Sequence, residues 1–220
     1  MKNVKKVYDN GITALHDLTV QIDQGEFVYV VGPSGAGKST FMKLIYREVV
    51  PTSGTVQVAE FDTVNMKDSE IPYLRRQVGV VFQDFKLLPT LTIFENVAYA
   101  MEVLGKKPRQ IKTRVTEVLK LVGLAHKTNM LPNELSGGEQ QRVCIARAIV
   151  NDAPIIFADE PTGNLDTKMS VEIMELFVSL NRELERTIIL VTHEEDIARY
   201  AKRIIRIVDG EISSDTRNKK

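Results

Sequence analysis

The stretch that decides the fold is Gly32-Pro33-Ser34-Gly35-Ala36-Gly37-Lys38-Ser39. It fits the phosphate-binding pattern in which two glycines, separated by four residues, are followed by a lysine and a hydroxyl residue. Glycine lets the backbone curl so that successive N–H groups face one anion, and the positive end of a following helix adds to the attraction. Lys38 is therefore expected to reach the β- and γ-phosphates of a nucleotide, and the Ser39 hydroxyl to ligate Mg²⁺.

The segments on either side of this loop have the periodicity of a strand and a helix. The apolar run 27–31 predicts a buried parallel strand. Residues 40–49 predict a helix with its apolar residues on one face: Phe41, Leu44, Ile45 and Val49. A glycine-rich turn that only joins two elements is the alternative, but a chance match in such a chain is on the order of one in a hundred. The context favours a nucleotide site, in which we include Thr40.

The composition bounds the size, charge and compartment of the protein. A chain of 220 residues can form one domain with a sizeable core, with or without a small insertion. Lys+Arg and Asp+Glu are equal at 29 each, so no global charge attracts nucleic acid or an anionic membrane. The single cysteine, Cys144, excludes an intrachain disulfide and suits a reducing cytosol. Its place in an apolar helical run predicts a buried, unreactive thiol.

No segment predicts a signal peptide or a membrane span. Residues 1–6 carry charge with no apolar stretch behind them. No apolar run approaches the roughly 20 residues that cross a bilayer. We therefore expect a cytoplasmic protein without direct membrane insertion, which reaches a membrane only through a partner.

Further strands are predicted near both ends of the chain. Leu18, Val20 and Ile22 alternate with polar residues and predict an antiparallel strand. Residues 54–58 and 78–82 predict two more strands. Asp209-Gly210 is a hairpin signal between two apolar segments, and the polar tail 213–220 is expected to be frayed.

Three isolated side chains are ambiguous on position alone. Tyr8 is either an ordinary strand tyrosine or a flat surface on which an adenine ring stacks. Gln83 directly follows the strand 78–82, where it ligates Mg²⁺, orients water beside a γ-phosphate, or is simply solvated. His193 follows an apolar strand at 187–191 and is either structural or a hydrogen-bonding partner of a γ-phosphate.

Two carboxylates, Asp159 and Glu160, end the apolar strand that begins near residue 154. An aspartate at the end of such a strand supplies the hard oxygen ligand that a Mg²⁺–nucleotide site needs. Glu160 is placed to accept a proton from an attacking water. The alternative is that both acids are simply solvated in a loop. The apolar character of the strand, which indicates burial, argues against this alternative.

Residues 84–150 change to helical periodicity and predict a helical subdomain inserted between strands. Gly123 is a plausible C-cap of its helix at 111–122. A second long helix opens at Ser136-Gly137-Gly138-Glu139, where Ser136 and Glu139 fit a capping box. Two glycines in a first helical turn cost roughly 1 kcal/mol each against alanine, and a cap has no need of them. Their bare N–H groups favour a second phosphate contact.

These segments, in this order and spacing, resemble the nucleotide-binding domain of an ATP-binding cassette (ABC) protein over essentially the whole chain. Leu135-Ser136-Gly137-Gly138-Glu139 is the most specific piece of the resemblance. The resemblance implies a single domain, 1–220, that hydrolyses ATP with Mg²⁺. It implies a phosphate-loop (RecA-like) α/β core with an antiparallel β-subdomain at 1–84 and 152–220, and a helical subdomain at 85–151.

The resemblance also assigns roles to the ambiguous residues. It implies that Tyr8 stacks on adenine, and that Gln83 and His193 are the Q-loop glutamine and the switch histidine. Asp166 would be the D-loop aspartate, preceded here by the variant Gly163-Asn164.

Residues 75–89 and 94–103 are similar to the bacterial cell-division branch of this family. This similarity implies a homodimer on ATP binding and an integral membrane subunit (FtsX-like) that holds it at the inner face of the cell membrane. The ATPase would then regulate peptidoglycan hydrolysis outside the cell. ATPases for lipoprotein release and macrolide export share every catalytic motif and remain the alternative.

Other functional classes fit the sequence less well. Cassette proteins that act on DNA need a long coiled-coil insertion, and translation factors carry two cassettes on one chain. This sequence has neither feature, so no nucleic-acid partner is expected. An intact Glu160 argues against a nucleotide-binding module without catalysis.

The segment after Gln83 predicts a docking surface for the membrane partner. It holds six large apolar residues within ten positions: Phe85, Leu87, Leu88, Leu91, Ile93 and Phe94. Because Gln83 would touch the nucleotide, the nucleotide state can reach this surface through a short piece of backbone. The core of the helical subdomain is the alternative, and it is the expected place for half of the six.

Overall fold

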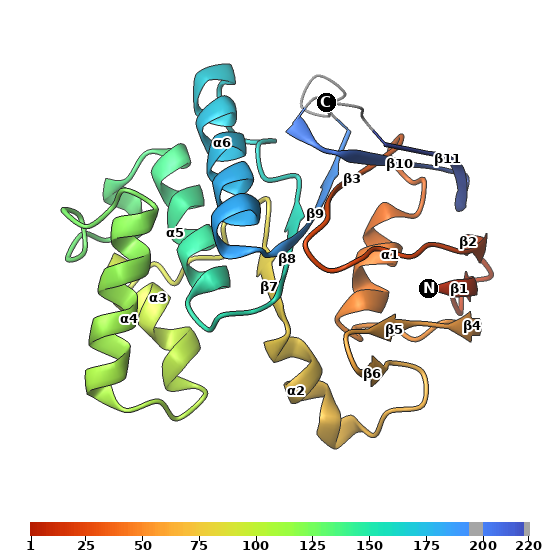
Figure 1. Ribbon diagram of the computed structural model, residues 1–220, viewed down its shortest axis with the longest axis horizontal. Helices are drawn as coiled ribbons and strands as arrows, with labels where there is room; N and C mark the ends of the chain where they lie inside the picture. The colour runs from red at the N-terminus through yellow and green to blue at the C-terminus, as the bar shows by residue number, and fades with distance from the viewer. Residues whose placement is uncertain (194–199, 218–220) are drawn as a thin grey trace.

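A six-stranded sheet forms the centre of the molecule (Figure 1). The computed structural model describes residues 1–193 and 200–217. The strand order is β11-β10-β3-β9-β8-β7, with β11 antiparallel to β10 and all other neighbours parallel. The strands span Phe27–Val31 (β3), Val78–Val81 (β7), Ile155–Asp159 (β8), Thr187–Thr192 (β9), Arg203–Val208 (β10) and Glu211–Arg217 (β11). The predicted α/β fold is confirmed.

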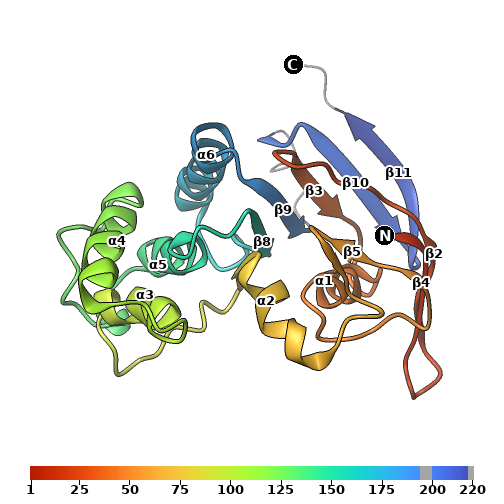
Figure 2. The same ribbon diagram turned by 60° about the horizontal axis from the view of Figure 1, so that its bottom comes forward.

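Helices cover both faces of this sheet (Figure 2). α1 packs on one face, and α5 and α6 pack on the other. These helices span Lys38–Ile45 (α1), Gly137–Ile149 (α5) and Thr167–Leu184 (α6). Val28 and Val30 of β3 pack with α1, whereas Tyr29 belongs to the core on the other face. Every residue of β3 is buried, as expected for a parallel strand between two helical layers.

Two smaller antiparallel sheets pack on the same side as α1. They contain β1 (Lys2–Val7), β2 (Thr13–Leu18), β4 (Ser53–Thr55), β5 (Gln57–Val58) and β6 (Phe61–Asp62), in the orders β2-β1-β4 and β5-β6. The predicted alternating strand was wrong beyond Leu18, although Val20 is buried. Residues 54–58 do not form one strand, because β4 pairs with β1 whereas β5 pairs with β6.

The remaining helices gather at one end of the molecule, next to α5 (Figure 1). They are α3 (Ile93–Glu102) and α4 (Pro108–Leu121), while the short α2 (Ile71–Arg76) precedes β7. Gly123 lies just beyond α4 with a φ of 80°, as predicted for a helix end. The limits of a separate helical subdomain at 85–151 stay a prediction. In the described parts of the chain, no helix is both long and apolar enough to cross a membrane.

α1 is shorter than its sequence periodicity predicts. It ends at Ile45, and Arg47 then adopts a left-handed φ of 56°. Val49 still packs against the core, but from outside the helix. The apolar pattern therefore predicts correctly that Val49 packs against the core, but it predicts the end of the helix incorrectly.

The C-terminal hairpin is more ordered than predicted. Asp209 and Gly210 have φ values of 47° and 80°, as a type I′ turn requires. β11 then continues to Arg217 instead of fraying at 213. Arg203 of β10 explains this extension, because its guanidinium donates to both carboxylate oxygens of Asp215, at 2.8 and 2.7 Å. Residues 218–220 of the predicted tail lie outside the described residues.

Cys144 lies on the core face of α5 and is fully buried. Burial raises the pKa of its thiol to about 12. A thiol with this pKa is almost entirely protonated at neutral pH, and the protonated form is a poor nucleophile. The predicted unreactive thiol is therefore confirmed.

Candidate functional site

Four parallel strands deliver the phosphate loop, Gln83, Asp159 and His193 to one edge of the central sheet. The phosphate loop 32–37 follows β3, Gln83 comes after β7, Asp159 ends β8, and His193 follows β9. Because these strands are parallel, their carboxyl ends meet at the same edge. Ligands in open α/β sheets bind at such an edge.

The phosphate loop is closed by its own lysine. Lys38 Nζ donates to the carbonyl oxygens of Gly32 at 2.7 Å and Pro33 at 2.9 Å. Gly37 is the N-cap of α1 and has no side chain to satisfy the first N–H groups of the helix. Ser34 and Ser39 are exposed. The loop therefore offers an ammonium group, helix N–H groups and hydroxyls to an anion.

Two loop glycines are required by close packing as well as by anion binding. A Cβ at Gly32 would lie 2.0 Å from the carbonyl oxygen of Ile207 in β10. A Cβ at Gly37, where φ is 104°, would lie 2.6 Å from the carbonyl oxygen of Ala14 in β2. Gly210 in the C-terminal hairpin donates its N–H to Ala36 at 3.0 Å. The loop is thus supported from outside by two distant strands and a hairpin.

Asp159 lies half-buried at the end of β8. Burial raises the pKa of its carboxyl group, and the neighbouring Glu160 raises it further, while Lys38 acts in the opposite direction. No group in the described residues donates a hydrogen bond to this carboxylate. A half-buried carboxylate without a partner has the character of a cation ligand.

Glu160 and His193 form a pair. Glu160 Oε1 lies 2.9 Å from Nδ1 of His193, and the His193 backbone N–H donates to Oε2 at 3.4 Å. Glu160 has a left-handed φ of 44° and donates its own N–H to Val191 of β9 at 2.9 Å. This left-handed conformation of Glu160 directs its carboxylate toward the end of β9. The Glu160 side chain is only 14% exposed, whereas the His193 side chain is 61% exposed.

Gln83 is exposed and lies against the loop that follows Glu160. Asn164 Nδ2 donates to the backbone oxygen of Gln83 at 2.9 Å. A Cβ at Gly163 would lie 3.0 Å from Gln83 Nε2. Asp166 then caps α6 by accepting the N–H of Met169 at 2.9 Å. The Gly163-Asn164 pair, which the sequence showed only as a variant, therefore positions Gln83.

The helix start at Ser136 is a capping box, as one of the two interpretations predicted. Ser136 Oγ accepts the N–H of Glu139 at 3.4 Å, and Glu139 Oε2 accepts the N–H of Ser136 at 3.0 Å. Lys127 pairs with Glu139 at 2.7 Å. A Cβ at Gly138 would lie 2.5 Å from Met169 Cε, so the flexible Met169 side chain would have to move to admit a larger residue there. The second phosphate contact stays a prediction.

Tyr8 is tied to the helix that follows the phosphate loop. Its hydroxyl lies 3.2 Å from Thr40 Oγ1, and Lys6 Nζ lies 5.1 Å from its ring centroid. The ring is half-buried and therefore keeps an accessible part. This placement fits an aromatic surface near a nucleotide, although the adenine-stacking role stays a prediction.

The residues predicted to hold Mg²⁺ are Ser39, Gln83 and Asp159. Their hydroxyl, amide and carboxylate oxygens are the hard ligands that Mg²⁺ prefers. Within the described residues, no group of three or more His, Cys, Asp or Glu side chains forms a cage for a metal ion. Mg²⁺ commonly uses one or two protein carboxylates together with phosphate oxygens and water, so the donor set fits an ion that arrives with a nucleotide.

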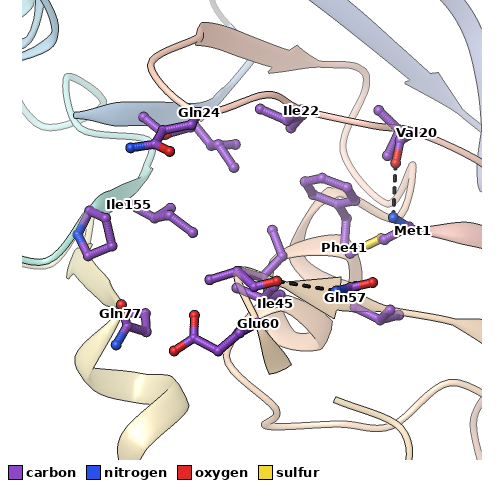
Figure 3. Close-up of a pocket in the computed structure, with 16 residues that line it drawn as sticks. Met1, Val20, Ile22, Gln24, Phe41, Ile45, Gln57, Glu60, Gln77 and Ile155 are labelled. Atoms are coloured by element: carbon purple, nitrogen blue, oxygen red, sulfur yellow. Dashed lines mark hydrogen bonds between the residues drawn. The ribbon is translucent and has the colours of Figure 1, made fainter. Parts of the chain in front are cut away.

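An apolar cavity of about 380 Å³ lies at the opposite edge of the sheet (Figure 3). Its walls include Phe41 and Ile45 of α1, and Ile155 and Thr187 at the starts of β8 and β9. None of the predicted site residues lines it. The cavity is therefore separate from the site at the carboxyl ends of the strands.

Comparison with known proteins decides the family. Residues 15–163 match the ABC transporter family. The chain belongs to the ABC transporter family. It is an ATPase of the ABC type that binds ATP.

Among curated proteins, this ABC ATPase is 55% identical over 216 residues to the cell division ATP-binding protein FtsE of Bacillus subtilis, covering 98% of this chain and 94% of that protein. It is 46% identical over 217 residues to FtsE of Mycobacterium tuberculosis, with the same two coverages. The uncharacterized ABC transporter ATP-binding protein YknY of Bacillus subtilis is 48% identical, covering 96% and 94%.

A solved structure is similar over the whole length of this ABC ATPase. It is the dimeric post-hydrolysis state of the ATP-binding cassette MJ0796 from Methanocaldococcus jannaschii, bound to ADP and Pi. It has a TM-score of 0.88 and 41% identity, and the match covers 100% of this chain and 98% of that chain. The phosphate-loop core predicted from the sequence is thus confirmed by the family as well as by the sheet topology.

Proposed function

We propose that this ABC ATPase hydrolyses Mg-ATP as a homodimer and drives an integral membrane subunit (FtsX-like) in bacterial cell division, where it regulates peptidoglycan hydrolysis. The observation that carries the cell-division role is 55% identity to FtsE proteins over 98% of the chain. A transporter ATPase for lipoprotein release or macrolide export is the second candidate, favoured by the identity to YknY. The protein would lie in the cytoplasm, at the inner face of the membrane.

The pairing of Glu160 with His193 supports hydrolysis. An ionised Glu160 accepts the Nδ1 proton of His193 through Oε1, while its Oε2 holds only a long contact of 3.4 Å. Oε2 is therefore the atom free to take a proton from an attacking water. His193, at the end of β9 beside Glu160, would hydrogen-bond the γ-phosphate.

The phosphate loop and the metal ligands would position the nucleotide. Lys38 would exchange its two backbone carbonyl contacts for the β- and γ-phosphates. Asp159, Ser39 and Gln83 would hold Mg²⁺, which supplies positive charge against the phosphate oxygens. The raised pKa of Asp159 supports this role, because a cation would relieve the cost of its burial.

The start of α5 supports the homodimer. Ser136 caps the N–H of Glu139, and among the described residues no other side chain caps the first-turn N–H groups of α5. In the homodimer we place Ser136, Gly137 and Gly138 on the γ-phosphate bound by the other protomer, with Asp166 at the interface. The dimeric state of the MJ0796 cassette supports this arrangement.

We propose that the docking surface includes a groove next to the segment 85–94. Ile93 is fully buried and belongs to the core, where half of the six apolar residues were expected, and Phe85, Leu87 and Phe94 pack partly against that core. Leu88 is 39% exposed, as a docking residue should be. A groove of about 610 Å³ lies between α2 and α3.

This groove has the chemistry of a binding site for an amphipathic segment. Val103, which is 67% exposed, and Phe82 give it apolar walls, and Arg75, Arg76 and Arg147 give it positive charge. None of these three arginines forms a salt bridge with a described residue. We therefore place there a partner segment that combines apolar and acidic residues.

The test is co-purification of the tagged protein from detergent-solubilised membranes, with identification of the bound subunit. Val103→Glu places a carboxylate in the groove and should lose the membrane subunit while ATPase activity persists. Leu121→Glu is the matched control, because Leu121 is a 42% exposed apolar residue on α4 outside the groove. If Val103→Glu retains the partner, the groove is not the docking surface. Recovery of a lipoprotein-release or macrolide-export subunit would favour the second candidate.

A further inference from the structure

Two consecutive residues after Gln83 adopt an unfavourable backbone conformation. Phe85 and Lys86 have φ values of 57° and 48°. Such left-handed values are rare for bulky residues, and they persist only where the surrounding structure imposes them. Something outside this segment therefore holds the kink in place.

The residue that holds the kink is Arg147 on α5. Its Nη1 donates to the carbonyl oxygen of Lys86 at 2.6 Å, and its Nη2 donates to that of Phe85 at 2.8 Å. The thiol of Cys144, one turn earlier on the same helix, lies 3.0 Å from the same Phe85 oxygen. The planar guanidinium fits two adjacent carbonyls in a way that a lysine ammonium does not.

The same segment is held from its other end. Asn164 donates to the backbone oxygen of Gln83 at 2.9 Å. Residues 83–86 therefore lie between α5, which carries Arg147, and the loop that follows Glu160. α5 also begins at Ser136, so one rigid helix carries both the predicted second phosphate contact and the group that fixes the kink after Gln83.

We propose that Arg147 is a positioning residue for Gln83. Its two hydrogen bonds to the Phe85 and Lys86 carbonyl oxygens, here called the Arg147 fork, fix where the Gln83 side chain meets the metal–nucleotide complex. The inference rests on the proposed metal role of Gln83. Loss of the fork frees the kink, and Gln83 then no longer presents its amide oxygen at a fixed place. The phosphate loop is unaffected, because its supports come from β2, β10 and the C-terminal hairpin.

The test compares two substitutions on one helix. Arg147→Lys keeps the charge and removes the fork. Arg142→Lys is the matched control, because Arg142 also lies half-buried on α5 and donates to a backbone oxygen, that of Val122 at 3.2 Å, but does not contact the segment 83–86. Hydrogen exchange of residues 83–88 is measured without nucleotide, together with the Mg²⁺ dependence of ATP hydrolysis and ATP binding in EDTA.

For Arg147→Lys, we expect exchange of residues 83–88 to accelerate about threefold or more, since local opening is what exchange reports. The Mg²⁺ concentration for half-maximal hydrolysis should rise about threefold or more, with ATP affinity in EDTA within about twofold of the unmodified protein. Arg142→Lys should change neither the local exchange nor the Mg²⁺ dependence.

Two outcomes overturn the inference. One is unchanged local exchange in Arg147→Lys, and the other is an equal shift of exchange and Mg²⁺ dependence in Arg142→Lys, which would indicate a general loosening of α5. Gln83→Ala separates this failure from that of the proposed function. If Gln83→Ala leaves the Mg²⁺ dependence unchanged, the metal role of Gln83 is wrong, while the exchange measurement still decides whether Arg147 holds the kink.

Discussion

Nδ1 of His193 lies 2.9 Å from Oε1 of Glu160, and this contact holds the two side chains together. With Glu160 ionised, a hydrogen bond at this distance has Nδ1 of His193 as the donor and Oε1 of Glu160 as the acceptor. The same carboxylate also accepts the backbone N–H of His193 through Oε2 at 3.4 Å, so His193 orients both of its oxygens. The two residues come from the ends of neighbouring parallel strands, β8 and β9.

We predict that Glu160→Gln and Lys38→Ala fail differently. Glu160→Gln removes the base and keeps the shape of the site, so turnover should fall about 10²- to 10⁴-fold while ATP still binds. Lys38→Ala removes the charge that holds the phosphates, so it should weaken ATP binding itself. Steady-state hydrolysis and equilibrium ATP binding measure the two effects. Near-normal turnover of Glu160→Gln at saturating ATP would contradict the base assignment.

We predict that ATP drives dimerisation of the Glu160→Gln variant. Slow hydrolysis should trap the ATP-bound state, and sedimentation should show a species of twice the mass. Adding Ser136→Arg should abolish this species, because a bulky side chain would occupy the start of α5 where the γ-phosphate of the other protomer is placed. A double variant that still dimerises with ATP would exclude this interface.

We predict that Asp159→Asn stabilises the protein at neutral pH when nucleotide and metal are absent. The raised pKa of Asp159 means that the folded state binds this proton more tightly than the unfolded state. Folding stability therefore falls as pH rises through the raised pKa, and the ionised carboxylate is a cost at pH 7. The gain in melting temperature should shrink as the pH falls toward the ordinary carboxyl range.

Thermal unfolding between pH 4 and 8 measures this effect. Glu175→Gln is the control, because Glu175 is an exposed acid on α6. A stabilisation that is independent of pH would mean that Asp159 ionisation is not its cause.

We predict that Phe85→Ser and Leu88→Ser separate core from surface. Phe85 packs partly against the core, so its loss should destabilise the protein by about 2 kcal/mol or more. Leu88 is exposed, so Leu88→Ser should change stability by about 0.5 kcal/mol at most. Denaturant titration measures both. Equal destabilisation by the two changes would show that Leu88 also contributes to the core.

The sequence was most informative where local pattern and fold agree. The glycine loop, its flanking strand and the acidic pair after β8 could be placed because a buried strand ending in polar residues is a local signal. The runs of apolar residues were less informative, because they indicate that some residues are buried but not which of them face the core and which face solvent. Thr92 caps α3, and this start turns Ile93 inward while Leu88 stays exposed.

Contacts between distant segments could not be predicted. Arg147 donates a hydrogen bond to Phe85, which lies 62 residues earlier in the chain. Phe85 and Lys86 have left-handed φ values, but neither is a glycine, so the sequence gives no sign of this conformation. The pairing of Arg203 with Asp215 extends β11 through a tail whose composition predicts fraying. In both cases the local structure depends on an arginine side chain that hydrogen-bonds to a different segment of the chain.

The order of the strands has a consequence for protein synthesis. β3, which carries the phosphate loop, lies between β9 and β10, and Gly210 supports the loop through Ala36. A ribosome makes these supports long after β3, and at 5–20 residues per second roughly 10 s or more separate β3 from β10. Without β9, β10 and the Gly210 turn, the nascent chain lacks these supports of the phosphate loop. We therefore expect stable ATP binding only after β10 has been made, and products of termination before β10 should lack it.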